Sequence, residues 1–127
     1  MPTTPIPGQP VRGSSTGRPL MAALDLLGRR WSLRILWELR DGTLGARALR
    51  ARCDDMSSSV LYDRLGELVD AGLVAQDGAL EYGLTRLGRE LGTAIAPLDA
   101  WSLRWSAALS PKGAPKRSSQ SGKKRGR

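Results

Sequence analysis

A helix followed directly by a β-hairpin, predicted over residues 57–84, is the feature that most constrains the fold of this chain. Ser57 is a favoured residue for the amino-terminal cap of a helix. The apolar residues after it recur at helical spacing and form one stripe: Val60, Leu61, Leu65, Leu68 and Val69. Gly72 stands where a helix ends in a left-handed residue. The pattern therefore predicts a helix that begins after Ser57 and ends before Gly72.

Two short runs that favour β-strands follow this helix, at residues 73–76 and 80–84. Asp77-Gly78 between them is a strong signal for a tight hairpin turn. A helix with small polar residues at its amino end, followed by a hairpin, is how a winged helix-turn-helix meets DNA. Side chains at the start of the helix then reach base edges while the hairpin lies along the backbone. DNA binding is therefore the first functional hypothesis.

Three shorter helices are predicted upstream, over residues 20–28, 31–42 and 45–53. Apolar residues cover most of the circumference of the second, which predicts a central and largely buried helix with Trp31 and Trp37 in the core. The third is weakly apolar, and its inward-facing residues are Ala46, Leu49 and Cys53. Together with the helix after Ser57, it has the length that a helix-turn-helix needs.

A long helical segment is predicted over residues 85–109, with Thr85 as its cap. Pro97 interrupts the segment, so we expect a kink or break near Ala96 and a second piece that begins at the proline. The last piece places Leu98, Trp101 and Trp105 on one stripe.

The composition divides the chain into a disordered lead (1–18), a folded domain (19–110) and a disordered basic tail (111–127). The net charge is +8, of which residues 112–127 carry +7, whereas residues 20–110 carry −1. A DNA-binding face on the folded domain must therefore come from an uneven arrangement of charge. The tail is open to three interpretations: a non-specific DNA arm, which we favour, a solubilising end, or a nuclear localisation signal.

The sequence lacks the motifs that are typical of several function classes. The chain has no histidine, no cysteine pair for zinc, no phosphate-binding glycine loop and no nucleophile elbow, so we expect no enzyme activity, no metal and no cofactor. It has no apolar run of membrane-spanning length, and its amino end lacks the apolar core of a signal peptide. With a single cysteine, these observations favour the cytoplasm.

Blocks of the sequence resemble HxlR-type winged-helix transcriptional regulators. They are LDLLGRRW (24–31), LRDG (39–42), MSSSVLYDRLGELVDAGLV (56–74), EYGLTRLGREL (81–91) and PLDAW (97–101), in the order and spacing of that family. The resemblance covers about residues 19–109. It implies a dimeric DNA-binding protein of a bacterium or archaeon that acts at the nucleoid, with the first and last helices forming the dimer interface. No effector ligand follows from it.

Three features depart from the family pattern. The family often has a redox-reactive cysteine just before the first helix, and this chain has Gly17-Arg18-Pro19 there. The third helix opens with Leu44, Gly45 and Ala46 rather than with a basic residue and an aromatic. The wing is short and carries Gln76, Asp77 and Glu81 rather than arginines, so weak wing contacts to phosphate are expected.

The candidate DNA-binding residues lie on the third helix and on the presumed recognition helix: Arg47, Arg50, Ser57, Ser58, Ser59, Tyr62 and Arg64. Capping is an alternative role for Ser57, and an ion pair with Glu67 is an alternative for Arg64. The candidate dimer interface comprises Leu20, Leu24, Leu98, Trp101 and Trp105. Cys53 is expected to be a buried structural residue, because Asp54 and Asp55 beside it disfavour a thiolate.

The fold class that we predict is mainly α with a small β-hairpin: a winged helix-turn-helix extended by a carboxy-terminal dimerisation helix. The predicted function is sequence-specific binding of double-stranded DNA as a homodimer that regulates transcription. Two alternatives remain open at this point: a winged-helix module for protein–protein interaction, and a non-specific nucleoid-type DNA binder driven by the tail.

Overall fold

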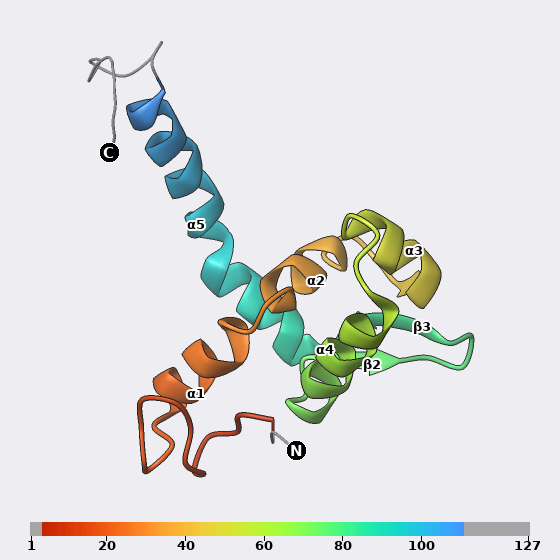
Figure 1. Ribbon diagram of the computed structural model, residues 1–127, viewed down its shortest axis with the longest axis horizontal. Helices are drawn as coiled ribbons and strands as arrows, with labels where there is room; N and C mark the ends of the chain where they lie inside the picture. Colours follow the sequence, from red (N-terminus) through yellow and green to blue (C-terminus); the bar gives the residue numbers. More distant parts are fainter. Residues whose placement is uncertain (1–3, 111–127) are drawn as a thin grey trace. The chain divides into compact units, whose positions relative to one another are not determined.

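The computed structural model describes residues 4–110, which form five α-helices and three β-strands (Figure 1). The helices are α1 (Pro19–Leu27), α2 (Ser32–Glu38), α3 (Ala46–Arg52), α4 (Ser58–Asp70) and α5 (Arg86–Leu109); the strands are β1 (Leu44–Gly45), β2 (Val74–Gln76) and β3 (Glu81–Leu84). The chain divides after Gly92 into two compact units. The predicted class, mainly helical with a small β-wing, is confirmed.

The core of the first unit lies between α2, α3, α4 and β2. Its most deeply buried apolar residues are Ile35, Leu39, Leu49, Cys53, Leu61, Leu65, Leu68 and Val74. The central part of the predicted α4 stripe is fully buried, whereas Val69 at its end is 42% exposed. Gly72 has the predicted left-handed backbone, with φ of 81°. The burial of this stripe fixes which face of α4 remains in solvent.

The sheet has three antiparallel strands in the order β1-β3-β2, and its hairpin lies beside α4 (Figure 1). The two-residue strand β1 was not predicted, because two residues are too few to show an alternating pattern. The hairpin turn predicted at Asp77-Gly78 is present, and it comprises the four residues 77–80 between β2 and β3. Asp77 Oδ1 accepts hydrogen bonds from the Ala79 and Glu81 amides, and Leu80 takes the left-handed conformation instead of Gly78.

The second helix is shorter and less buried than predicted. Its amino-terminal cap is Trp31, which packs partly buried against the core with φ of 78°. Leu33 and Trp37 are 38% and 43% exposed, so the prediction that Trp37 belongs to the core is wrong. The Arg40 guanidinium covers the Trp37 ring at 3.9 Å from its centroid. A helix of only two turns that packs on neighbours along one side leaves its other side in water.

The last helix, α5, continues through Pro97, so the predicted break near Ala96 is wrong. Proline removes one backbone hydrogen bond, but the backbone remains helical before and after it, so the helix is continuous. The predicted cap is confirmed, because Thr85 Oγ1 accepts a hydrogen bond from the Gly88 amide at 3.1 Å. Within residues 93–110, Leu98, Trp101 and Trp105 are about half exposed, and the two indole rings stack at 5.4 Å between centroids.

Residues 4–18 form turns with hydrogen bonds within the segment and to α1, and the disorder predicted for residues 1–18 stays a prediction. The Gly8 amide donates to the Gly17 carbonyl at 2.9 Å, and the Arg12 amide donates to Asp25 in α1 at 3.1 Å. Gly8 and Gly17 have positive φ angles, which let this segment turn back on itself. The predicted basic tail, residues 111–127, lies outside the described residues.

Candidate nucleic-acid interface

The amino end of α4 is held by the predicted cap. Ser57 Oγ accepts a hydrogen bond from the Val60 amide at 3.3 Å and lies 3.0 Å from Ser59 Oγ. This bond satisfies one of the free amides at the start of the helix. The capping role of Ser57 is therefore confirmed, and its contact with DNA stays a prediction.

The exposed face of α4 at this end carries hydroxyl groups. Ser58, Ser59 and Tyr62 all lie in solvent, and the Tyr62 side chain is 54% exposed. Residues 58 and 62 are one helical turn apart, so they share a face. The buried stripe runs beside these residues, since Leu61 and Leu65 are each 1% exposed. The structure thus exposes together, at the start of α4, the three residues that are predicted to contact DNA.

The three candidate arginines have different surroundings. Arg47 is exposed and makes no hydrogen bond or ion pair within residues 4–110. Arg50 donates through Nε to the Met56 carbonyl at 2.5 Å, which ties the end of α3 to the residue before the α4 cap. Arg64 Nη1 lies 2.5 Å from Glu67 Oε1, and its side chain is only 20% exposed. The ion pair considered for Arg64 is therefore present.

Glu67 joins α4 to the connection between α1 and α2. Its Oε1 pairs with Arg64, and its Oε2 lies 2.8 Å from Arg29 Nη1. We call these three residues the Glu67 clasp. The carboxylate is 15% exposed, so loss of either partner leaves a poorly solvated charge. No local pattern predicts the contact between Arg29 and Glu67, because 38 residues separate the two partners.

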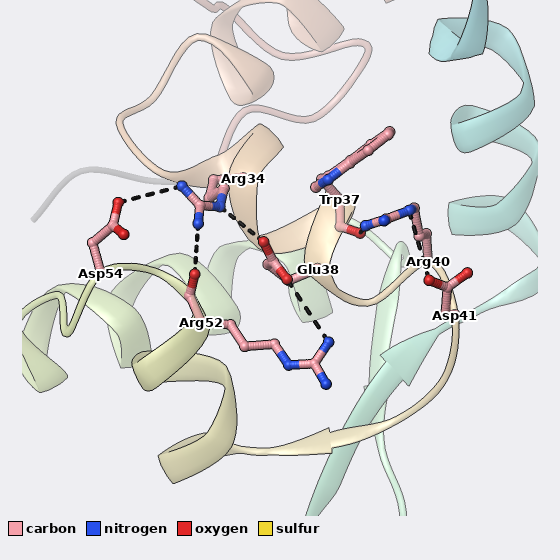
Figure 2. Close-up of polar contacts among 7 residues, drawn as sticks. All are labelled: Arg34, Trp37, Glu38, Arg40, Asp41, Arg52 and Asp54. Carbon is pink, nitrogen blue, oxygen red and sulfur yellow. Dashed lines mark hydrogen bonds and ion pairs between the residues drawn. The ribbon is translucent and has the colours of Figure 1, made fainter. Parts of the chain in front are cut away.

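A second set of polar contacts ties α2 to the turn between α3 and α4 (Figure 2). Arg34 donates to the Arg52 carbonyl at 2.6 Å and to Glu38 at 3.0 Å, and it lies 3.4 Å from Asp54. Glu38 also faces Arg52 at 3.9 Å. We call these four residues the Arg34 network. The hydrogen bond to Glu38 raises the pKa of the Arg34 guanidinium, which is charged at every physiological pH.

The turn that this network supports has an unusual backbone. Asp54 and Asp55 both have positive φ, at 56° and 55°. Aspartate tolerates the left-handed region better than most residues, yet two in succession carry a conformational cost. The Asp55 amide donates to the Arg50 carbonyl at 3.0 Å, and the contact between Arg34 and Asp54 adds a second restraint. The position of α4 relative to α3 therefore depends on side chains outside both helices.

The wing is acidic rather than basic. The Asp77 carboxylate accepts hydrogen bonds from two backbone amides of the hairpin, and Glu81 accepts a hydrogen bond from Thr43 at 2.6 Å. No lysine or arginine occurs between residues 73 and 84. The described hairpin thus offers a phosphate only its backbone amides and neutral side chains, in line with the expected weak contacts.

Cys53 is fully buried at the end of α3. Burial raises the pKa of its thiol, Glu38 and Asp54 raise it further, and Arg34 lowers it. The environment thus favours the neutral thiol, as expected for a structural cysteine. Within residues 4–110 no cluster of histidine, cysteine and acidic side chains is suited to hold a metal ion. No helix in the described part of the chain is long and apolar enough to cross a membrane.

Comparisons with known proteins agree with this architecture. The HxlR-like helix-turn-helix family model matches residues 26–110. An uncharacterised HTH-type transcriptional regulator of Methanocaldococcus jannaschii is 29% identical over 96 residues, which are 72% of this chain and 90% of the relative. The HTH-type regulator YvaP of Bacillus subtilis is 30% identical over 89 residues, which are 65% of this chain and 82% of the relative.

Two solved structures are also similar. Quinone-bound YodB from B. subtilis superposes with a TM-score of 0.63 at 28% identity, over 68% of this chain and 96% of YodB. A possible HxlR family transcriptional factor from Thermoplasma volcanium gives a TM-score of 0.60 at 27% identity, over 66% of this chain and 81% of that protein. The resemblance predicted from the sequence blocks is thereby confirmed.

The buried position of Cys53 predicts slow alkylation. At pH 8 we expect iodoacetamide to modify the folded chain at least about tenfold more slowly than the chain unfolded in urea. The rate should begin to rise at a higher pH in the folded chain, because its thiol pKa is raised. Mass spectrometry of timed samples measures both rates. Equal rates in the folded and unfolded chain would contradict the assignment of Cys53 as a structural residue.

Proposed function

Because the chain belongs to the HxlR-like helix-turn-helix family of transcriptional regulators, we propose that it binds specific double-stranded DNA sequences as a homodimer. The observation that carries this proposal is the hydroxyl-bearing face at the amino end of α4, formed by Ser58, Ser59 and Tyr62. The adjacent apolar stripe is buried, so the exposed side chains of α4 are the ones available to a partner. The regulator acts on the chromosome, at the nucleoid in the cytoplasm.

The chemistry of this face suits base recognition in the major groove. A serine hydroxyl both donates and accepts, so it bonds to either kind of base-edge group. The start of a helix also carries partial positive charge, which favours a nearby phosphate. Arg47 on α3 is exposed and forms no ion pair within the described residues. It is therefore the candidate to bind a phosphate of the DNA backbone and so fix the register of the protein on the duplex.

The proposed homodimer covers apolar side chains that a single copy leaves in water. On α1 these are Leu20 and Leu24, 64% and 54% exposed; on α5 they are Leu98, Trp101 and Trp105. Stable interfaces bury about 1,200–2,000 Å² in total, and we expect α1 and α5 of the two copies to bury an area of that order. A two-fold dimer then presents one α4 to each of two successive major grooves.

The acidic wing favours a second candidate function. Asp77 and Glu81 lie where a DNA-binding hairpin usually carries cations, and they suit a basic protein surface. In this alternative, the hairpin and α4 form a docking face for another protein. The tail-driven, non-specific DNA binder is a third possibility. Both alternatives predict no preference among DNA sequences for the described unit.

The first test removes the hydroxyl face. In vitro selection from a random library supplies a cognate site, and fluorescence anisotropy then measures affinity for that site and for a scrambled one. Ser58→Ala, Ser59→Ala and Tyr62→Ala together should erase the preference, because each lost base contact costs about 1–3 kcal/mol. Asp70→Ala, at the exposed far end of the same helix, should keep it. Preserved discrimination in the triple variant, with native circular dichroism, would rule out this face as the reader.

The second test concerns assembly. Trp101→Glu and Trp105→Glu together place two charges in the proposed apolar seam, so we expect sedimentation equilibrium to show a monomer. Arg104→Glu is the control, since it changes charge on the same exposed helix outside the seam. A wild-type chain that stays monomeric at tens of micromolar would refute the homodimer, whereas a dimeric double variant would refute this seam.

A further inference from the structure

A shallow pocket of about 480 Å³ opens on the first unit, where the connection between α1 and α2 approaches the turn between α3 and α4. This volume is within the range of about 300–1,000 Å³ that small-molecule sites occupy. The lining residues are Leu27, Arg29, Arg30, Trp31, Leu33, Arg34 and Asp54. The pocket thus combines an indole ring and two leucines with three guanidinium groups and one carboxylate.

Guanidinium groups outnumber carboxylates around the pocket. In the Glu67 clasp one carboxylate forms ion pairs with two arginines. In the Arg34 network two carboxylates form ion pairs with two arginines. Arg30 adds a fifth guanidinium, and it pairs with no carboxylate within residues 4–110. At the pocket itself, three guanidinium groups (Arg29, Arg30 and Arg34) stand against one carboxylate (Asp54), so the lining is positively charged although residues 20–110 as a whole carry −1.

Arg30 and Trp31 give the pocket its chemical character. The Arg30 guanidinium carbon lies 5.7 Å from the centroid of the Trp31 ring, so a cation stands over an aromatic face. Trp31 has φ of 78°, a strained conformation for a bulky aromatic residue. Strained residues of this kind concentrate at ligand sites and switch regions. A flat apolar group beside the indole can therefore place an anionic substituent at Arg30.

We propose that this pocket binds a small organic anion with a flat apolar body, such as an aromatic carboxylate, and that binding lowers the affinity for DNA. Arg30 pairs with the anionic group, and Trp31, Leu27 and Leu33 contact the apolar body. The regulatory half of this inference rests on the proposed function, whereas the binding half does not.

The pocket is coupled to the DNA-reading helix through two of its own arginines. Arg29 holds Glu67 of α4 at 2.8 Å, and Arg34 holds Asp54 in the left-handed turn before α4 at 3.4 Å. An anion in the pocket competes with both carboxylates for these arginines, so the restraints on α4 weaken. By linkage, the ligand and DNA then lower each other's affinity by the same factor.

The binding half is tested by calorimetry on the full chain with 1-naphthoate, its neutral analogue 1-naphthalenemethanol, and inorganic phosphate. We expect saturable binding of naphthoate at one site per chain and at least about tenfold weaker binding of the alcohol, because the charge-assisted bond to Arg30 is lost. Phosphate lacks the apolar body and should also bind at least about tenfold more weakly.

Two matched variants locate the site. Arg30→Gln should weaken naphthoate binding at least about tenfold. Arg40→Gln should not, although Arg40 also covers a tryptophan ring, because it lies outside the pocket. Equal binding of the acid and the alcohol, equal loss in the two variants, or no saturable binding at millimolar naphthoate would each overturn the site.

The regulatory half is tested with the selected DNA site. Saturating naphthoate should lower the DNA affinity of the wild type and of Arg40→Gln by roughly fivefold or more, and should leave Arg30→Gln unchanged. Unchanged wild-type affinity with naphthoate bound would overturn the coupling. A loss of DNA affinity in Arg30→Gln without naphthoate would instead make the pocket a contact for DNA phosphate. Absence of specific DNA binding before any addition is a separate result that contradicts only the proposed function.

Discussion

The buried stripe of α4 is the constraint on which the rest of the first unit depends. Leu61, Leu65 and Leu68 are at most 1% exposed, and each contributes about 1.5–3 kcal/mol through removal from water. Apolar burial is not directional, so it holds α4 against the core without fixing every detail of its position. The Glu67 clasp and the Arg34 network supply directional contacts, one on α4 itself and one on the turn before it. The buried stripe and these directional contacts together determine which side chains of α4 are exposed to solvent.

The distribution of charge follows from the same arrangement. Four arginines of the first unit make internal contacts: Arg29 and Arg64 with Glu67, Arg34 with the turn before α4, and Arg50 with the Met56 carbonyl. A face that reads DNA through hydroxyls and few free cations depends less on phosphate attraction than a basic face does. Its binding should therefore discriminate among sequences more than it responds to salt, apart from any contribution of the tail.

Local signals in the sequence were sufficient for the parts of the fold that are set by local chemistry. The Ser57 and Thr85 caps, the left-handed Gly72 and the buried stripe of α4 each follow from a few neighbouring residues, and the structure has all of them. Local reasoning failed where distant packing decides. Trp37 is exposed because α2 meets its neighbours on one side only, and Pro97 sits within a helix that continues on both sides.

The candidate site likewise has one part that local sequence predicts and another that depends on contacts between distant residues. The exposure of Ser58, Ser59 and Tyr62 follows from the position of these residues outside the apolar stripe. The contacts that hold this face in place join residues 38 and 20 positions apart, namely Arg29 with Glu67 and Arg34 with Asp54. No spacing rule predicts such pairs, because the partners become neighbours only when the chain has folded. The pocket beside Trp31 is unpredictable from sequence for the same reason.

The central claim, that the amino end of α4 enters the major groove, is tested most directly by affinity cleavage. An iron chelate attached at Ser59→Cys should be selective, since Cys53 is fully buried. On a selected DNA site we predict two clusters of strand cleavage whose centres lie about 10–11 base pairs apart, one for each copy of α4. The same chelate at Asp70→Cys, about 16 Å along the helix, should cut weakly. Equal or stronger cleavage from position 70, or diffuse cleavage from position 59, would contradict the account.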